Sequence, residues 1–274
     1  MIVVKFGGEL LEESSRLQTV VSAMARVASE HEPLVIVHGG GKEIDAALKR
    51  AGIEKQQVDG LRITDEATLE TVVAVLAGTV NTRLVAALAV AGVAAVGLTG
   101  ADGGCGLSDT APPHRAADGR TVDLGRVGTP ADHADMRLLR TLTENQFVPV
   151  IACIGLGVDG RLLNVNADTF AAHLAGGLGA RRLVVAGTTP GVLDGQGATT
   201  PLIGLEAIER LIKDGTASAG MVAKLNACAH ALARGVAEVV IVDGRDRTAL
   251  EGASLGTPPA TVTRIAQAPV GRTS

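Results

Sequence analysis

The chain has 274 residues, of which 46% are hydrophobic and only 1% are aromatic. That is enough apolar material for a sizeable core of Val, Leu, Ile and Ala, in one large α/β unit or in two lobes that share a sheet. The net charge of −4 and the lack of Trp and Tyr argue against a nucleic-acid partner, which basic patches and aromatic stacking usually hold.

Cysteine content and hydropathy give an expectation for the cellular compartment of the protein. Cys105, Cys153 and Cys228 are odd in number and show no CxxC spacing, which is typical of reduced, buried thiols. The chain enters a short strand at once with no signal peptide, and no apolar run is expected to reach the roughly 18 residues of a membrane span. We therefore expect a soluble, cytoplasmic protein with no membrane partner.

The first two predicted strands, at residues 2–6 and 34–38, both end in glycine turns. These turns are Gly7-Gly8 and Gly39-Gly40-Gly41, and each is followed by an amphipathic helix. Glycine has no Cβ, so consecutive glycines allow backbone N–H groups to close around an anion, and the following helix adds its positive N-terminus. Two such turns, with Lys5 in the first strand, indicate the handling of a transferable phosphate.

Strands and helices continue to alternate along the chain. Residues 52–63 are irregular, and Thr64 is expected to cap a long helix that is interrupted near Gly78. Further helices are predicted at 132–145, 167–178, 205–213 and 221–233, strands at 94–98, 147–154, 162–165, 182–186, 238–242 and 260–265, and a hairpin tip at 117–120. This alternation predicts a parallel sheet with helices on both faces.

Three familiar motifs are absent or misleading. Gly155–Gly160 matches GxGxxG, but its Asp159-Gly160 turn leads into a strand rather than a helix, which argues against a dinucleotide site. Gly41-Lys42 is followed by Glu43, so there is no Walker A motif. The six histidines form no HExxH-like pair, and no zinc site is expected.

Three polar positions are candidates for chemistry. A strand-end lysine such as Lys5 ordinarily extends to solvent, but the adjacent glycines favour an ammonium placed over a bound anion. In the segment Asn164–Asp168, either Asn166 or Asp168 could simply cap the next helix. Lys224, considered alone, indicates no more than a solvated helix face.

Seven segments in chain order resemble the amino-acid kinase superfamily. They are VVKFGG, VIVHGGGKEID, GLRITDEATLE with AGTVN, VGLTGADGG, PVIACIGLGVDGRLLNVNAD, PGVLDG and GMVAKLNAC. The resemblance implies a three-layer αβα sandwich with an open, mainly parallel sheet. It also implies an N-terminal lobe at 1–170 that binds the amino acid and forms a homodimer, and a C-terminal lobe at 171–274 that binds ATP.

The resemblance assigns roles to matching residues. Lys5 and Lys224 would flank the transferred γ-phosphoryl group, and Asp168 would hold both lysines. Other implied site residues are the amide donors Gly7, Gly8, Gly39 and Gly40, the substrate-binding Arg62 and Asn164, and the nucleotide-loop residues Thr188 and Gly191. Mg²⁺ is expected with ATP, most of its ligands coming from phosphates and water, because the sequence shows no carboxylate cluster for a protein-held metal.

The implied reaction is phosphorylation of the γ-carboxylate of N-acetyl-L-glutamate by ATP in arginine biosynthesis. A carboxylate nucleophile is already ionised at neutral pH, so no general base is needed. The sequence does not fix the acyl group, and N-succinylglutamate, carrier-linked aminoadipate or another amino acid stays open.

Two departures from the family pattern leave a second alternative open. Thr188 stands where the family usually has Asp, which suggests a low-turnover regulatory protein that binds the ligands, and Gly256–Pro259 departs from the usual family ending. No helix precedes the first strand, and the resemblance is therefore to arginine-insensitive dimers rather than to arginine-inhibited hexamers.

Overall fold

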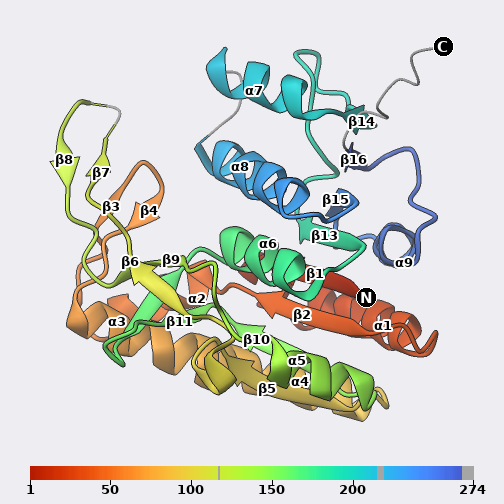
Figure 1. Ribbon diagram of the computed structural model, residues 1–274, viewed down its shortest axis with the longest axis horizontal. Coiled ribbons are helices and arrows are strands. Elements are labelled where there is room, and N and C mark those ends of the chain that lie inside the picture. The colour runs from red at the N-terminus through yellow and green to blue at the C-terminus, as the bar shows by residue number, and fades with distance from the viewer. Residues whose placement is uncertain (117, 215–218, 267–274) are drawn as a thin grey trace.

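An eight-stranded sheet forms the centre of the computed structural model, which describes residues 1–116, 118–214 and 219–266 (Figure 1). The strand order is β14-β16-β15-β13-β1-β2-β10-β5. The strands from β15 to β5 are parallel, whereas β16 is antiparallel to β15. Their bounds are β1 Ile2–Phe6, β2 Leu34–His38, β5 Ala95–Thr99, β10 Val148–Ala152, β13 Arg182–Gly187, β14 Leu202–Ile203, β15 Glu238–Asp243 and β16 Thr263–Ala266.

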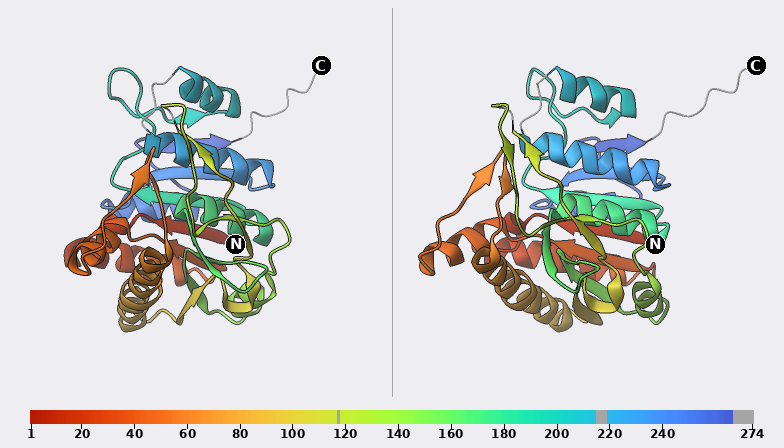
Figure 2. Two further views of the ribbon diagram at one scale, coloured as in Figure 1. Left: turned by 90° about the vertical axis from the view of Figure 1, so that its left-hand side faces the viewer. Right: turned by 60° about the vertical axis from the view of Figure 1, so that its left-hand side comes forward.

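Helices cover both faces of this sheet (Figures 1 and 2). One layer contains α5 (Arg137–Glu144), α6 (Ala167–Leu178) and α8 (Ala219–Ala233), and the other contains α1 (Ser14–Ala28), α4 (Asn81–Val90) and α9 (Arg247–Leu255). Every residue of β1, β2, β10 and β13 is buried, which explains why these strands are continuous apolar runs. The predicted three-layer αβα fold is confirmed.

The order in which successive strands join the sheet reverses at β1. After β1 the chain adds β2, β5 and β10 on one side, and it adds β13 and β15 on the other. In open α/β sheets, ligands bind in the crevice that such a reversal leaves at the carboxyl ends of the strands. Lys5 and the first glycine turn lie at this end of β1.

One long helical stretch packs on the sheet near its edge strand, β5. It joins α3 (Glu66–Val73) to α4 through a π-helical segment, Ala74–Val80. The interruption predicted near Gly78 is therefore a change of helical pitch, not a break. Contrary to expectation, Glu66–Val90 is long and apolar enough to cross a membrane by length and composition alone, but it packs on β5 and α1.

The N-cap predicted for this helix was wrong by one residue. Asp65 is the cap, and its carboxylate accepts a hydrogen bond from the amide of Thr68 at 2.8 Å. Thr64 is fully buried, and its hydroxyl donates to the carbonyl of Arg62 at 3.2 Å. An acidic side chain at the cap also complements the helix dipole, which a threonine does not.

A four-stranded sheet, β11-β12-β9-β6, lies over the carboxyl ends of the main sheet. β11 (Ile154–Leu156) and β12 (Leu162–Val165) form an antiparallel hairpin through Asp159-Gly160. The GxGxxG string therefore lies in a hairpin, as predicted. The strand expected at 147–154 is divided at Cys153, and the helix expected from 132 begins only at Arg137.

The other elements are short or peripheral. They are β3 Gln57–Val58, β4 Leu61–Arg62, β6 Ser108–Thr110, β7 His114–Arg115, β8 Thr121–Val122, β9 Val127–Pro130, α2 Gly41–Arg50 and α7 Leu205–Lys213. β7 and β8 form the predicted hairpin, of whose tip Ala117 lies outside the described residues. The polar tail predicted after residue 265 lies outside them from residue 267 onward. All three cysteines are free and buried, and burial raises the pKa of each thiol to about 12.

Candidate active site

Two lysines from distant parts of the chain share one carboxylate. The Nζ atom of Lys5, in β1, lies 2.8 Å from Oδ1 of Asp168 in the first turn of α6. The Nζ atom of Lys224, in α8, lies 3.4 Å from the same oxygen and 3.5 Å from Oδ2. Lys5 is only 7% exposed, so it does not extend to solvent. The helix cap is Asn166, which leaves the Asp168 carboxylate to the lysines.

The three charged groups of the cluster shift one another's pKa values. Burial alone would raise the pKa of Asp168, but Lys5 and Lys224 outweigh burial and lower that pKa to about 2. Burial opposes the charge on Lys5, yet Asp168 raises its pKa. Burial and the charge of Lys5 lower the pKa of Lys224, which Asp168 only partly offsets. With both lysines protonated, the cluster carries one uncompensated positive charge, which suits a bound anion.

The two glycine turns touch each other beside this cluster. A Cβ built on Gly8 would lie 2.5 Å from the Cα of Gly40, so neither turn tolerates a side chain at the contact. The amides of Gly7 and Gly39 are bonded within the sheet, to Ala186 O at 3.0 Å and to Phe6 O at 3.1 Å. Within the described part of the chain, the amides of Gly8 and Gly40 donate no hydrogen bond. The two turns thus offer free donors at a single place.

Polar side chains continue from the turns toward β4 and β12. Arg62 forms an ion pair with Asp45 of α2, and its buried Nη1 has no hydrogen-bond partner among the described residues. The Nδ2 atom of Asn164 donates to the hydroxyl of Thr64 at 3.1 Å. A buried guanidinium nitrogen without an acceptor is costly to leave unpaired, so the surroundings of Arg62 are suited to a carboxylate ligand.

The predicted nucleotide-loop residues lie on the other side of β1. Thr188 follows β13, and its carbonyl accepts a hydrogen bond from Arg245 at 2.9 Å. A Cβ on Gly191 would lie 2.3 Å from the hydroxyl oxygen of Thr263, so close packing against β16 requires glycine there. No hydrogen bond or ion pair between described residues joins Thr188 or Gly191 to the lysine cluster.

Comparisons with known proteins decide the family. Residues 1–243 match the Amino acid kinase family. The chain belongs to this family. Acetylglutamate kinase from Acidiphilium cryptum is 43% identical over 248 residues, covering 89% of this chain and 83% of the relative. Acetylglutamate kinase from Granulibacter bethesdensis is 40% identical, with the same coverage of both chains.

Solved structures agree with the fold. The crystal structure of smu.665 from Streptococcus mutans UA159 is 29% identical, with a TM-score of 0.77, and covers 88% of this chain and 94% of that one. Carbamate kinase from Giardia lamblia bound to AMP-PNP is 16% identical, with a TM-score of 0.69 over 97% of this chain and 98% of that one. At that identity the likeness concerns the fold alone.

A buried histidine network behind the second glycine turn was not predicted. His38 is fully buried at the end of β2. Its Nδ1 lies 3.2 Å from the carbonyl of Gly39, and its Nε2 lies 3.0 Å from Nδ2 of Asn81. Burial lowers the pKa of His38 to about 4, so the ring is neutral and can bridge the turn to α4. The apolar strand ending in His-Gly was a signal for His38, and Asn81 lay in the family-like segment AGTVN, but nothing in the sequence indicated that the two residues meet.

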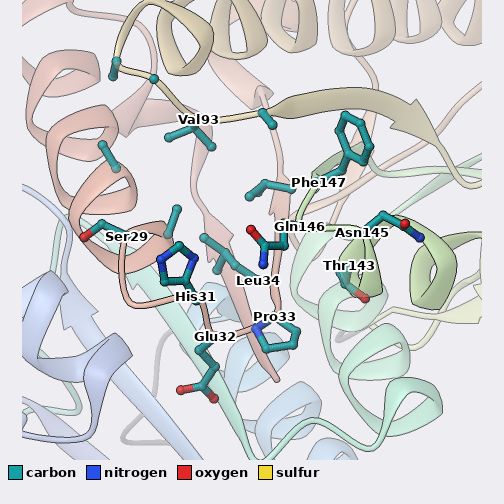
Figure 3. Close-up of a pocket in the computed structure, with 16 residues that line it drawn as sticks. Ser29, His31, Glu32, Pro33, Leu34, Val93, Thr143, Asn145, Gln146 and Phe147 are labelled. Carbon is teal, nitrogen blue, oxygen red and sulfur yellow. The ribbon is translucent and has the colours of Figure 1, made fainter.

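A cavity of about 430 Å³ lies away from these residues, at the amino ends of β2, β5 and β10 (Figure 3). Leu34, Val93 and Phe147 line it together with the polar side chains of His31 and Gln146. Glu32 beside it is paired with the N-terminal amine at 3.3 Å and with Arg181. Because parallel strands place their functional groups at the opposite, carboxyl edge, this cavity is not the candidate active site.

Proposed function

We propose that this amino acid kinase transfers the γ-phosphoryl group of ATP to the γ-carboxylate of N-acetyl-L-glutamate. The observation that carries the proposal is the pair of lysines on Asp168 beside the two touching glycine turns. Curated relatives named acetylglutamate kinase, 38–43% identical over 89% of the chain, favour this substrate. The product, N-acetylglutamyl 5-phosphate, would serve arginine biosynthesis.

The two lysines would stabilise the transferred group. In an in-line transfer, a bond forms between the substrate carboxylate oxygen and the γ-phosphorus, and the bond to the β–γ bridging oxygen breaks, releasing ADP. Lys5 and Lys224 would neutralise the charge on the equatorial oxygens, and the free amides of Gly8 and Gly40 would donate to them. Gly7 and Gly39 would shape the turns.

Asp168 would position the lysines rather than accept a proton. With a pKa of about 2, its carboxylate is ionised, and both oxygens face ammonium groups. The attacking γ-carboxylate is ionised at neutral pH as well. The reaction therefore needs no general base.

Arg62 and Asn164 would hold the amino-acid substrate. The unpaired Nη1 of Arg62 fits the α-carboxylate, because a guanidinium binds a planar carboxylate through two parallel donors. Asn164 would contact the same substrate. Thr188 and Gly191 would border the nucleotide.

Mg²⁺ would accompany ATP. When bound, it would neutralise part of the charge of the phosphates. No group of three or more His, Cys, Asp or Glu side chains gathers as a metal site in the described ranges. This donor set fits a cation held mainly by phosphates and water.

Hydroxylamine trapping tests the reaction. Purified full-length protein with ATP, Mg²⁺ and N-acetylglutamate should yield a hydroxamate from the acyl phosphate, and Lys224→Ala should abolish it while the circular dichroism spectrum is unchanged. No hydroxamate from the wild type would overturn the proposed substrate. N-succinylglutamate and carrier-linked aminoadipate, assayed alongside, identify the acceptor in that event.

A low-turnover regulatory protein is the second candidate, favoured only by the neutral Thr188 in the nucleotide loop. Binding of N-acetylglutamate and ATP without ADP release would support it. We further propose that residues 1–170 bind the amino acid and form a homodimer, that residues 171–274 bind ATP, and that the protein acts in the cytoplasm. Light scattering of the purified protein tests the dimer.

A further inference from the structure

Glu9 reaches across the crevice between the carboxyl ends of β1 and β13. A Cβ built on Gly7 would lie 2.4 Å from both Glu9 carboxylate oxygens, and a Cβ built on Gly187 would lie 3.5 Å from Oε1. The carboxylate therefore lies over the first glycine turn and faces the last residue of β13. This is the point at which the sheet reverses its direction of growth.

The charge of Glu9 helps to raise the pKa of Lys5, but its carboxylate is not held by a bonded partner as neighbouring carboxylates are. Asp168 is held by two lysines, and Asp243, at the end of β15, is held by Arg245 at 2.6 Å. Glu9 forms no hydrogen bond or ion pair through its carboxylate with any residue of the described ranges, and it is half-exposed. Thr188, which follows Gly187, brings no charge.

A phosphate chain beside the glycine turns would meet this carboxylate. Charges of the same sign repel, so without a cation between them this carboxylate would weaken the binding of the phosphates. A divalent cation between them reverses the sign of the interaction, and Mg²⁺ accepts carboxylate and phosphate oxygens while keeping several waters.

We propose that Glu9 is the protein's own ligand for the Mg²⁺ that enters with the nucleotide, bound directly or through a coordinated water. The proposal rests on the proposed kinase function, because it assumes that the nucleotide phosphates lie over Gly7-Gly8. It assigns to this chain a metal-binding carboxylate that is part of no acidic cluster and that lies only four residues after Lys5.

Calorimetry of ADP binding, with and without Mg²⁺, tests this role in wild type and in Glu9→Gln. In the wild type, Mg²⁺ should tighten ADP binding. In Glu9→Gln that gain should shrink by roughly 10-fold or more, the usual cost of losing one supporting ligand. ADP without metal should bind as well or better, since a repelling charge has gone. The electron paramagnetic resonance spectrum of Mn²⁺ in the ternary complex with ADP should differ between wild type and Glu9→Gln. This measurement requires no turnover.

Glu13→Gln is the matched control, because it removes the same charge four residues away. The Glu13 side chain is 57% exposed and pairs with Arg16 at 3.2 Å. It should keep the full Mg²⁺ gain. A full gain in Glu9→Gln, an equal loss in Glu13→Gln, or weaker metal-free binding in Glu9→Gln would overturn the proposal.

The proposed function fails separately from this inference. A wild type that yields hydroxamate while Glu9→Gln keeps the full Mg²⁺ gain overturns only the role of Glu9. A wild type that binds ADP more tightly with Mg²⁺, in a manner dependent on Glu9, but phosphorylates no acylated amino acid overturns only the proposed function.

Discussion

The two lysines of the site are held by different kinds of structure. Lys5 belongs to a strand that is paired on both sides, with Val37 of β2 and Val185 of β13 as its neighbours in register. Lys224 belongs to a helix that reaches Asp168 only through the packing of α8 on α6. The sheet thus fixes the first lysine, at 2.8 Å from the carboxylate, and helix packing sets the second, at 3.4 Å.

Small residues set the distance between the two helices. A Cβ on Gly176 of α6 would lie 2.7 Å from the Cβ of Arg234, just after α8. Helices pack more closely where one of them carries glycine, and packed interiors adjust little to an added methyl group. The position of Lys224 therefore depends on a contact that Lys5 does not need.

The largest expected effect is the loss of either lysine. Lys5→Met and Lys224→Met should each lower kcat by about 10²–10³-fold, since each removes one charge that stabilises the transferred phosphoryl group. Their stabilities should differ. Lys5→Met breaks the closer buried pair and should lower the free energy of unfolding by about 3 kcal/mol, whereas Lys224→Met should cost less, because burial and the charge of Lys5 already oppose the charge of Lys224 in the wild type. Hydroxamate assays and urea titrations measure both quantities, and equal destabilisation would contradict the comparison.

Gly8→Ala should damage the part of the site that the sheet fixes. Its Cβ would lie 2.5 Å from Gly40 Cα, so the two turns must separate. We expect a loss of roughly 1–3 kcal/mol in stability and a fall in kcat of about 10²-fold, because the lysine and the amide donors no longer align. Gly78→Ala is the control, because a Cβ there meets nothing within 4 Å. A fully active Gly8→Ala would show that the turns do not act together.

The carboxylate that joins the lysines should appear in the pH dependence of stability. The pKa of Asp168 is about 2 in the fold, against an ordinary value of 3.8. Because the unfolded chain takes up this proton at higher pH, the stabilisation is complete above about pH 4–5 and is lost as the pH falls toward 2. It amounts to about 2 kcal/mol. In urea titrations, the stability gap between wild type and Asp168→Asn should shrink by that amount over this range; a constant gap would contradict the lowered pKa.

Gly176→Ala should produce the smallest effect, and only on the helix that carries Lys224. Moving α8 away from α6 should lower kcat by about 10-fold while the KM for the acylated amino acid stays unchanged. Gly177→Ala is the neighbouring control, because its Cβ would meet the flexible end of Met136 at 2.8 Å. If both variants behaved alike in steady-state kinetics, the spacing of the helices would not govern Lys224.

Local patterns predicted most of the fold. Apolar runs ended by glycines located β1 and β2, because strands buried on both faces leave a continuous signal. Errors occurred where two local residues compete for one task, as with Thr64 and Asp65 at the same helix start. The π-helical segment was invisible, since it keeps the composition of an α-helix.

Local sequence patterns predicted the candidate active site less well than the fold. Lys224 and Asp168 are 56 residues apart, and only the family resemblance brought them together; the roles given to both remain predictions. Glu9 looks like an ordinary charge at a helix start, and Asp45, inside α2, looks like an ordinary charge on a helix surface. His38 and Asn81 are 43 residues apart, and their contact depends on how α4 packs on the sheet.

The central place of β1 in the sheet determines how late in synthesis its strand pairing is completed. β1 can pair with β2 early, but its other neighbour, β13, begins only at Arg182. At ordinary synthesis rates of about 5–20 residues per second, one edge of the first strand stays open for roughly 10–30 s. An open apolar edge can pair with other chains, so this interval is the time at which the nascent protein is most exposed to aggregation.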